Sequence, residues 1–121
     1  MKRVLLVAVT ALIGASVTRA QDPVKVDPKH YTVVFENDAV RVLRIHYPPG
    51  EKSVMHSHPD CVAVFLEDEK AKMTYLDATS EEMTGKKGEA VFTKAGVHLP
   101  ENIGTGPLDV VLVELKKPAT K

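Results

Sequence analysis

Three histidines are the residues of this sequence whose types and spacing suggest chemistry. His56 and His58 stand two positions apart, and His98 follows 42 residues after His56. Side chains at i and i+2 of a β-strand point to the same face, so the first two imidazoles would lie side by side. Three converging neutral imidazoles can hold a divalent metal ion. The spacing leaves one alternative open, an exposed or hydrogen-bonded pair of histidines on a surface strand.

Polar neighbours of these histidines could complete or orient a metal site. Cys61 lies three residues after His58 and is either a fourth, soft ligand or a small buried hydrophobe, of which the second is favoured. Asp60 and Glu101 could each orient a ligating imidazole, although ordinary exposed loop charge is the simpler interpretation. Asn102 is expected to fix its own loop through hydrogen bonds from its side chain to the backbone.

Two further histidines, His30 and His46, have no partner at useful spacing and are expected to be structural or exposed. The sequence contains no Gly-rich phosphate loop, no nucleophile elbow and no CxxC pair. Nucleotide binding, serine hydrolase chemistry and dithiol redox chemistry are therefore not predicted.

The elements that position these residues are expected to be short strands joined by turns. Residues 79–82 could cap a short helix, but the glycine at position 85 comes so soon that a brief strand or turn is favoured. Residues 67–70 indicate a charged loop. Seven or more short strands with regular turn signals predict a β-sandwich or a closed barrel. The predicted strands are Tyr31–Phe35, Val40–Tyr47, Val54–His58, Val62–Leu66, Ala71–Leu76, Ala90–Thr93 and Leu108–Leu115.

The first twenty residues have the pattern of a secretory signal peptide. Lys2 and Arg3 give a positive start, and an apolar run broken only by Thr10 follows over residues 4–13. This run is too short to cross a bilayer comfortably. Cleavage after Ala20 would leave residues 21–121 as one domain, located in the periplasm or secreted. An uncleaved membrane anchor or a first β-strand is the alternative.

The composition is typical of one ordinary globular domain. The chain has 121 residues, of which 44% are hydrophobic and 26% charged. Removing residues 1–20 takes three of the 16 basic residues and leaves 13 against 16 acidic ones, a net charge of −3. No basic stripe or basic amphipathic helix recommends a nucleic acid or a membrane as partner. The single cysteine excludes an internal disulfide, so a hydrophobic core must hold the fold.

Two blocks of the sequence resemble the two motifs of the cupin superfamily. Gly50-Glu-Lys-Ser-Val-Met-His56-Ser-His58 is similar to the first motif, and residues 88–102, with their late histidine and an asparagine four positions beyond it, are similar to the second. Residues 56–60, 95–98 and 101–104 also resemble small single-domain cupins, some of them named for β-alanine degradation. The resemblance covers nearly all of residues 21–121. It implies an all-β, double-stranded β-helix (jelly-roll) barrel with a divalent metal ion near its wider mouth.

The sequence departs from the cupin pattern at the fourth metal ligand. The usual glutamate should fall four or five residues after His58, where Val62 and Ala63 stand. Lys94 also replaces the proline expected before the Ala-Gly turn, and one residue is missing between that turn and the late histidine. Three neutral imidazoles leave the cation its full charge, which favours hydroxide, a carboxylate or another anionic chelating ligand in the open positions. Zn, Fe, Ni, Mn or Cu would each suit such a site.

The resulting expectation is an exported metal-binding cupin, with two hypotheses for its function. The first is a metal-dependent enzyme, such as an oxygenase, isomerase or hydrolase, acting on a small anionic molecule; three-His cupins include dioxygenases. The second is a non-catalytic module that binds a small molecule or a metal, which the missing glutamate suggests. A homodimer is expected because cupin barrels commonly pair their sheets. Metal should leave at about pH 6 or below if the histidines have ordinary pKa values.

Overall fold

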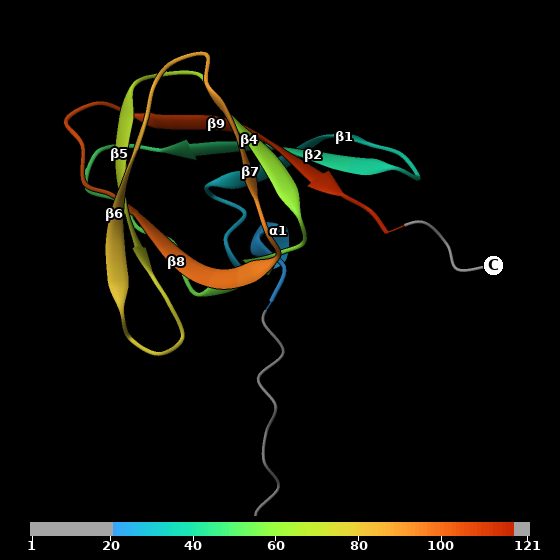
Figure 1. Ribbon diagram of the computed structural model, residues 1–121, viewed down its shortest axis with the longest axis horizontal. Helices are drawn as coiled ribbons and strands as arrows, with labels where there is room; N and C mark the ends of the chain where they lie inside the picture. The colour runs from blue at the N-terminus through green and yellow to red at the C-terminus, as the bar shows by residue number, and fades with distance from the viewer. Residues whose placement is uncertain (1–20, 118–121) are drawn as a thin grey trace, which may run out of the picture.

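A computed structural model describes residues 21–117 as two antiparallel β-sheets that enclose one core (Figure 1). One sheet has the strand order β1-β2-β9-β4-β7 and the other the order β3-β8-β5-β6. The prediction of an all-β fold is therefore confirmed, while the proposed signal peptide, residues 1–20, lies outside the described residues. The elements are α1 (Pro23–Val26), β1 (Tyr31–Glu36), β2 (Val40–Tyr47), β3 (His56–His58), β4 (Cys61–Phe65), β5 (Glu69–Thr74), β6 (Ser80–Gly85), β7 (Ala90–Thr93), β8 (Gly96–Asn102) and β9 (Leu108–Leu115).

Strand β9 is the centre of the larger sheet. It pairs with β2 along its whole length and with β4 on its other side. Every second residue of β9 is buried, as expected for a strand with one face on the core. The buried apolar residues come from both sheets and are Tyr31, Leu43, Ile45, Tyr47, Cys61, Ala71, Leu108, Val110 and Leu112.

The short helix α1 was not predicted from the sequence. Asp22 caps it by accepting a hydrogen bond from the backbone N–H of Val24 at 3.1 Å, and Pro23 occupies its first turn. An aspartate followed by proline is a regular start signal for a helix. The helix packs against β1 and β3, which places the start of the described chain beside the strand that carries two of the three histidines.

The sequence prediction was wrong for part of the loop at residues 67–70. Glu69 and Lys70 begin strand β5, where they pair with Gly85 and Thr84. Lys70 forms an exposed ion pair with Glu82, whereas Glu69 is half-buried and lines the space between the sheets. The adjacent charges of Glu69 and Lys70 suggested a loop. In a strand, however, adjacent side chains point to opposite faces, so one of the two charges faces the cavity and the other faces solvent. The favoured strand or turn at residues 79–82 is confirmed as part of β6.

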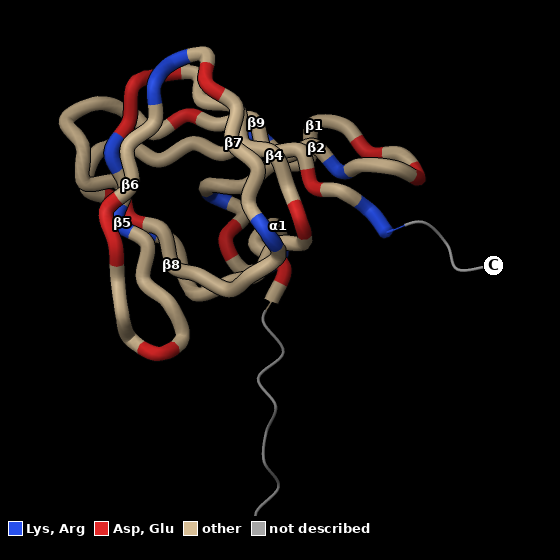
Figure 2. Tube along the Cα trace, viewed as in Figure 1, with Lys and Arg blue, Asp and Glu red and all other residues tan. Residues whose placement is uncertain are grey.

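Charges are interspersed over the described chain. Acidic and basic residues are both scattered over the described chain, with no large region of one sign (Figure 2). Within residues 21–117, no helix has the length and apolar character that a membrane span requires.

Candidate metal centre

The structure brings the three candidate histidines together at one end of the barrel. Strand β3 carries His56 and His58, and its neighbour β8 carries His98 directly opposite His56 in the antiparallel register. One ligand atom from each of the three lies within 4.8 Å of the others. The Nε2 atoms of His56 and His58 are 3.1 Å apart. The i, i+2 spacing and the turn before His98 therefore produce the convergence that the sequence predicted.

The outer nitrogens of two histidines fix which inner nitrogens can bind a cation. Nδ1 of His56 lies 2.8 Å from the carbonyl oxygen of Val54, and Nδ1 of His58 lies 2.7 Å from a carboxylate oxygen of Glu114. A carbonyl or carboxylate oxygen only accepts hydrogen bonds, so each Nδ1 carries the proton and donates it. Both Nε2 atoms then hold lone pairs and cannot hydrogen-bond to one another across 3.1 Å.

The third histidine has an unpaired nitrogen. Nε2 of His98 is buried and has no hydrogen-bond partner among the described residues. Leaving a buried polar nitrogen unsatisfied costs on the order of 1–3 kcal/mol. A divalent cation would accept the lone pair of His98 together with those of His56 and His58, so these residues fit a three-nitrogen metal site.

Burial keeps two of the three imidazoles neutral. Burial, followed by the neighbouring imidazole of His58, lowers the pKa of His56 to about 4. The same causes in the same order, with His56 added, lower the pKa of His98 to about 3. Neutral imidazole is the form that binds a metal ion. Loss of metal near pH 6 was expected for ordinary pKa values, and at these two positions protons compete only at lower pH.

A buried ion-pair network supports His58. Glu114, only 2% exposed, also accepts a hydrogen bond from Nε of Arg41 at 2.6 Å, and Arg41 reaches Asp22 at 2.8 Å. Burial acts to raise the pKa of Glu114, but the hydrogen bonds from His58 and Arg41 outweigh it and lower that pKa. Glu114 was not predicted from the sequence as a partner of the site. The available signal was a carboxylate on the core-facing side of the apolar run that forms β9.

A second network supports His56 from the N-terminal segment. The Ser53 hydroxyl lies 3.2 Å from Nδ1 of His56 and donates to Asp27 at 2.6 Å. Asp27 also accepts from Nδ1 of His30 at 2.8 Å, and Nε2 of His30 lies 2.8 Å from Glu51. His30 is therefore a buried, hydrogen-bonded residue, in line with its expected structural role. Ser53, Asp27 and Glu51 were not predicted from the sequence as partners of the site either.

Tyr31 places a phenol at the inner nitrogen of His56. Its hydroxyl lies 3.1 Å from Nε2 of His56 and accepts a hydrogen bond from the Tyr47 hydroxyl at 2.6 Å. Burial, then Tyr47, raises the pKa of Tyr31 well above its ordinary value, so the phenol keeps its proton. It can therefore donate that proton to Nε2 of His56 or to another acceptor at the same place.

The remaining candidate residues do not join the histidine cluster. Cys61 is buried and lines the same cavity, but its sulfur is outside the group of atoms within 4.8 Å of one another. Burial, followed by nearby carboxylates, raises the pKa of its thiol to about 11, which favours the small-hydrophobe interpretation. Asp60 accepts a hydrogen bond from the backbone of Ala95 in an exposed loop. Glu101 is half-buried and makes no side-chain hydrogen bond among the described residues.

Two other expectations are confirmed. The Asn102 side chain donates to the carbonyl oxygens of Tyr47 and Gly106 and accepts from the N–H of Gly104, all within 3.0 Å, and so fixes its own loop. The side chain of His46 is exposed and lies away from the cluster, 3.5 Å from Asp109.

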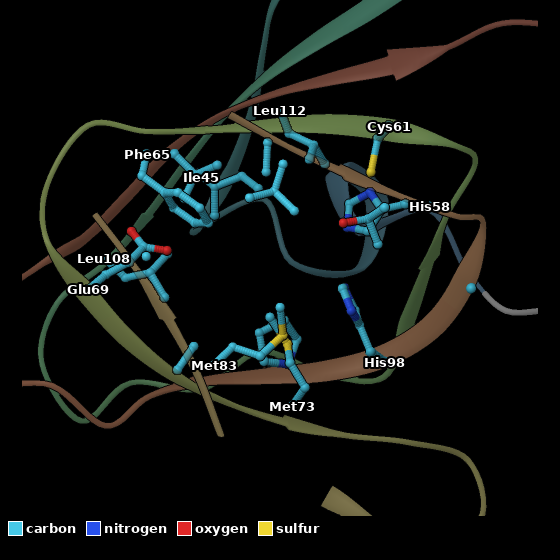
Figure 3. A pocket seen from close by; sticks show the side chains of 18 of the residues that line it. Ile45, His58, Cys61, Phe65, Glu69, Met73, Met83, His98, Leu108 and Leu112 are labelled. Carbon is cyan, nitrogen blue, oxygen red and sulfur yellow. The ribbon is translucent and has the colours of Figure 1, made fainter. Parts of the chain in front are cut away.

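A cavity of about 530 Å³ extends from the histidines between the two sheets. Figure 3 shows His58, His98 and Cys61 at one end and Glu69 at the other. Apolar side chains separate the two ends, among them Ile45, Phe65, Met73, Leu108 and Leu112. Exposed residues of β7 and the following turn, Thr93, Lys94 and Ala95, line the rim. The volume is that of a typical small-molecule pocket.

Three solved structures that resemble this chain are cupin or double-stranded β-helix proteins. A cupin domain from Bordetella pertussis Tohama I matches with a TM-score of 0.67 and 24% identity, over 72% of this chain and 92% of that one. A double-stranded β-helix protein from Klebsiella pneumoniae matches with a TM-score of 0.59 and 24% identity, over 74% and 78%. An RmlC-like cupin from Methanocaldococcus jannaschii matches with a TM-score of 0.56 and 18% identity, over 70% and 77%. No protein-family model and no curated protein matches the sequence.

Proposed function

Because the chain has the cupin fold, a double-stranded β-helix, we propose that it is an exported metal-binding cupin that acts on a small anionic molecule. His56, His58 and His98 hold the divalent metal ion, which is Zn, Fe, Ni, Mn or Cu. The observation that carries this proposal is the unpaired, buried Nε2 of His98 beside two further Nε2 lone pairs.

The residues around the site have different roles in binding. The metal, when bound, supplies a Lewis acid with open positions for an anionic group. Val54 and Glu114 hold two imidazoles in the tautomer that ligates. The Tyr31 hydroxyl offers a proton to an acceptor beside His56. Apolar walls exclude water and contact the body of the ligand. These roles are compatible with oxygenase, isomerase or hydrolase chemistry.

Elemental analysis tests the metal site. We expect near-stoichiometric metal in the untagged mature protein and its loss in His56→Ala and His98→Ala. His46→Ala is the matched control, since its imidazole is exposed and away from the cluster. Absence of metal from the parent protein, even after reconstitution with each of the five metals, would falsify the proposal.

A non-catalytic binding module is the second candidate. It is favoured by Val62 and Ala63 at the place of the usual carboxylate ligand, which leaves no carboxylate among the clustered ligand atoms. Oxygen uptake and turnover of a panel of carboxylic acids and diketones by the metal-loaded protein distinguish the two. Turnover that His98→Ala abolishes supports the enzyme, whereas binding without turnover across the panel supports the module.

Export rests on the charged, apolar and small-residue pattern of residues 1–20. The mass of the protein recovered from the periplasm tests it. We expect a chain that begins at Gln21, and an unprocessed chain retained in the cytoplasm would contradict export without bearing on the metal site.

A further inference from the structure

Glu69 is a carboxylate in an otherwise apolar part of the cavity. Its side chain lines the end of the pocket opposite the histidines, beside Phe65 and Leu108 (Figure 3). Its one hydrogen bond within the described chain is long, 3.3 Å from the backbone N–H of Asp109 to Oε2. It forms no ion pair with any described residue. The mechanism of metal binding does not use this group.

The charges near Glu69 leave its own charge unbalanced. Asp109, the neighbouring carboxylate, is already paired with Arg44 at 2.7 Å. Lys70, the next residue along β5, points to the opposite face and pairs with Glu82. Burial, with the charge of Asp109 adding to it, raises the pKa of Glu69 to about 7. A buried carboxylate without a cation is costly, and a ligand that brings a cation removes this cost.

We propose that Glu69 forms a subsite for a protonated amine at the far end of the cavity. The ligand is then an elongated molecule with an ammonium group at Glu69, an apolar body along the walls and an acid group at the metal. The acid end rests on the proposed function, whereas the amine end depends on Glu69 alone.

The length of the cavity sets the length of the ligand. Thr74 of β5 pairs with Leu99, the neighbour of His98 on β8, and Glu69 lies five residues earlier on β5. At about 3.3 Å per strand residue, the backbone of Glu69 lies roughly 17 Å along β5 from Thr74, the residue beside the His98 end of the cavity. Side chains that reach inward from both ends shorten the gap, but a short amino acid cannot bridge it. Met73 and Met83 line the middle and can adapt to a flexible chain.

Calorimetric titration of metal-loaded and metal-free protein distinguishes binding at the metal from binding at Glu69. The probes are octylamine, octanoate, 1-octanol, 8-aminooctanoate and 4-aminobutanoate. We expect octylamine to bind both forms of the protein, and Glu69→Gln to weaken it by about tenfold or more. Octanoate should bind only the metal-loaded form, with no effect of Glu69→Gln. The long amino acid should bind the loaded protein more tightly than either single-ended probe, and the short one should not.

Failure of this inference is distinguishable from failure of the metal proposal. If octanoate never binds but octylamine binds and depends on Glu69, the metal end fails and the amine subsite stands. Glu82→Gln, an exposed carboxylate on β6, is the matched control and should leave octylamine binding unchanged. In the unmodified protein, 1-octanol binding as tightly as octylamine would overturn the amine subsite, because a neutral donor would then suffice. Equal binding of octylamine to parent and Glu69→Gln would overturn it as well.

Discussion

At the scale of single residues, the candidate metal centre depends on the groups that accept hydrogen bonds from the outer nitrogens of the imidazoles. Val54 and Glu114 accept the Nδ1 protons of His56 and His58, so both rings present Nε2 to the same point. Such partners orient metal ligands and raise their basicity. Glu114 in turn keeps its negative charge because Arg41 and His58 both donate to it.

Replacing Glu114 by glutamine should weaken metal binding without removing a ligand. Glutamine keeps the shape but loses the charge that holds His58, and loss of such a partner typically costs 10–100-fold in metal affinity. Competition with a chromophoric chelator measures the affinity. Glu36→Gln, whose partner Lys116 is exposed, is the control. An unchanged affinity in Glu114→Gln would show that the charge of Glu114 does not contribute to metal binding through His58.

The free energy of unfolding of the metal-free protein should fall with acidification between about pH 6.5 and pH 3. The pKa values of His56 and His98 are about 4 and about 3 in the folded state, against an ordinary value of about 6.5 after unfolding. The unfolded chain therefore binds more protons in this window, and stability rises with pH. Urea unfolding across the window should give a shallower pH dependence for His98→Gln. His46→Gln should keep the parent dependence; identical slopes in all three proteins would contradict the depressed pKa values.

The sequence predicted the residues whose signal is local. His56 and His58 are two apart on one strand, so their shared face is a local signal. His98 lies 42 residues later and meets His56 through the pairing of β8 with β3, and the resemblance to the second cupin motif identified it. Glu114 was not predictable in the same way, since it meets His58 only because β9 inserts next to β4. Asp27 likewise reaches the centre only through tertiary packing.

At the scale of elements, most strands were predicted, but β8, which carries His98, was not among them and the edges of several others were wrong. Strands β2 and β9 were predicted with the bounds that the structure gives. The near-continuous apolar run of β9 suggested burial on both faces, but the structure fully buries only every second residue. Strand β5 begins two residues earlier than predicted, because Glu69 faces a cavity rather than solvent. A charged side chain on an interior face has no signature in periodicity, which assumes that interior faces are apolar.

Strand β6 passes close to the ring of Phe65 at Gly85, where the absence of a side chain leaves room for the ring. A Cβ placed at Gly85 would lie 2.8 Å from that ring. Gly85→Ala should therefore push Phe65 into the cavity and lower the free energy of unfolding by about 1–3 kcal/mol. Thermal or urea unfolding measures the change. Gly106→Ala is the control, because a Cβ there meets no atom within 4 Å, and a loss as large as that of Gly85→Ala would contradict the packing argument.

At the scale of the whole molecule, one arginine links the two ends of the described chain. Arg41 on β2 pairs with Asp22 before α1 and with Glu114 near the end of β9. Arg41→Gln should lower the free energy of unfolding by about 3 kcal/mol, because it leaves a buried carboxylate without its cation. Arg44→Gln on the same strand, where the pair is 46% exposed on the arginine side, should cost about 1 kcal/mol or less. Equal losses in urea unfolding would contradict the distinction.

The position of β9 also decides when the centre can form during synthesis. Among the described strands β9 is the last in sequence, yet it inserts between β2 and β4 and brings Glu114 to His58. Until that strand arrives, the nascent chain has three histidines but neither a closed sheet nor an oriented His58. Pairing of segments so far apart in sequence is slow compared with local folding. Under the proposed function, we therefore expect metal to bind after β9 has paired rather than before.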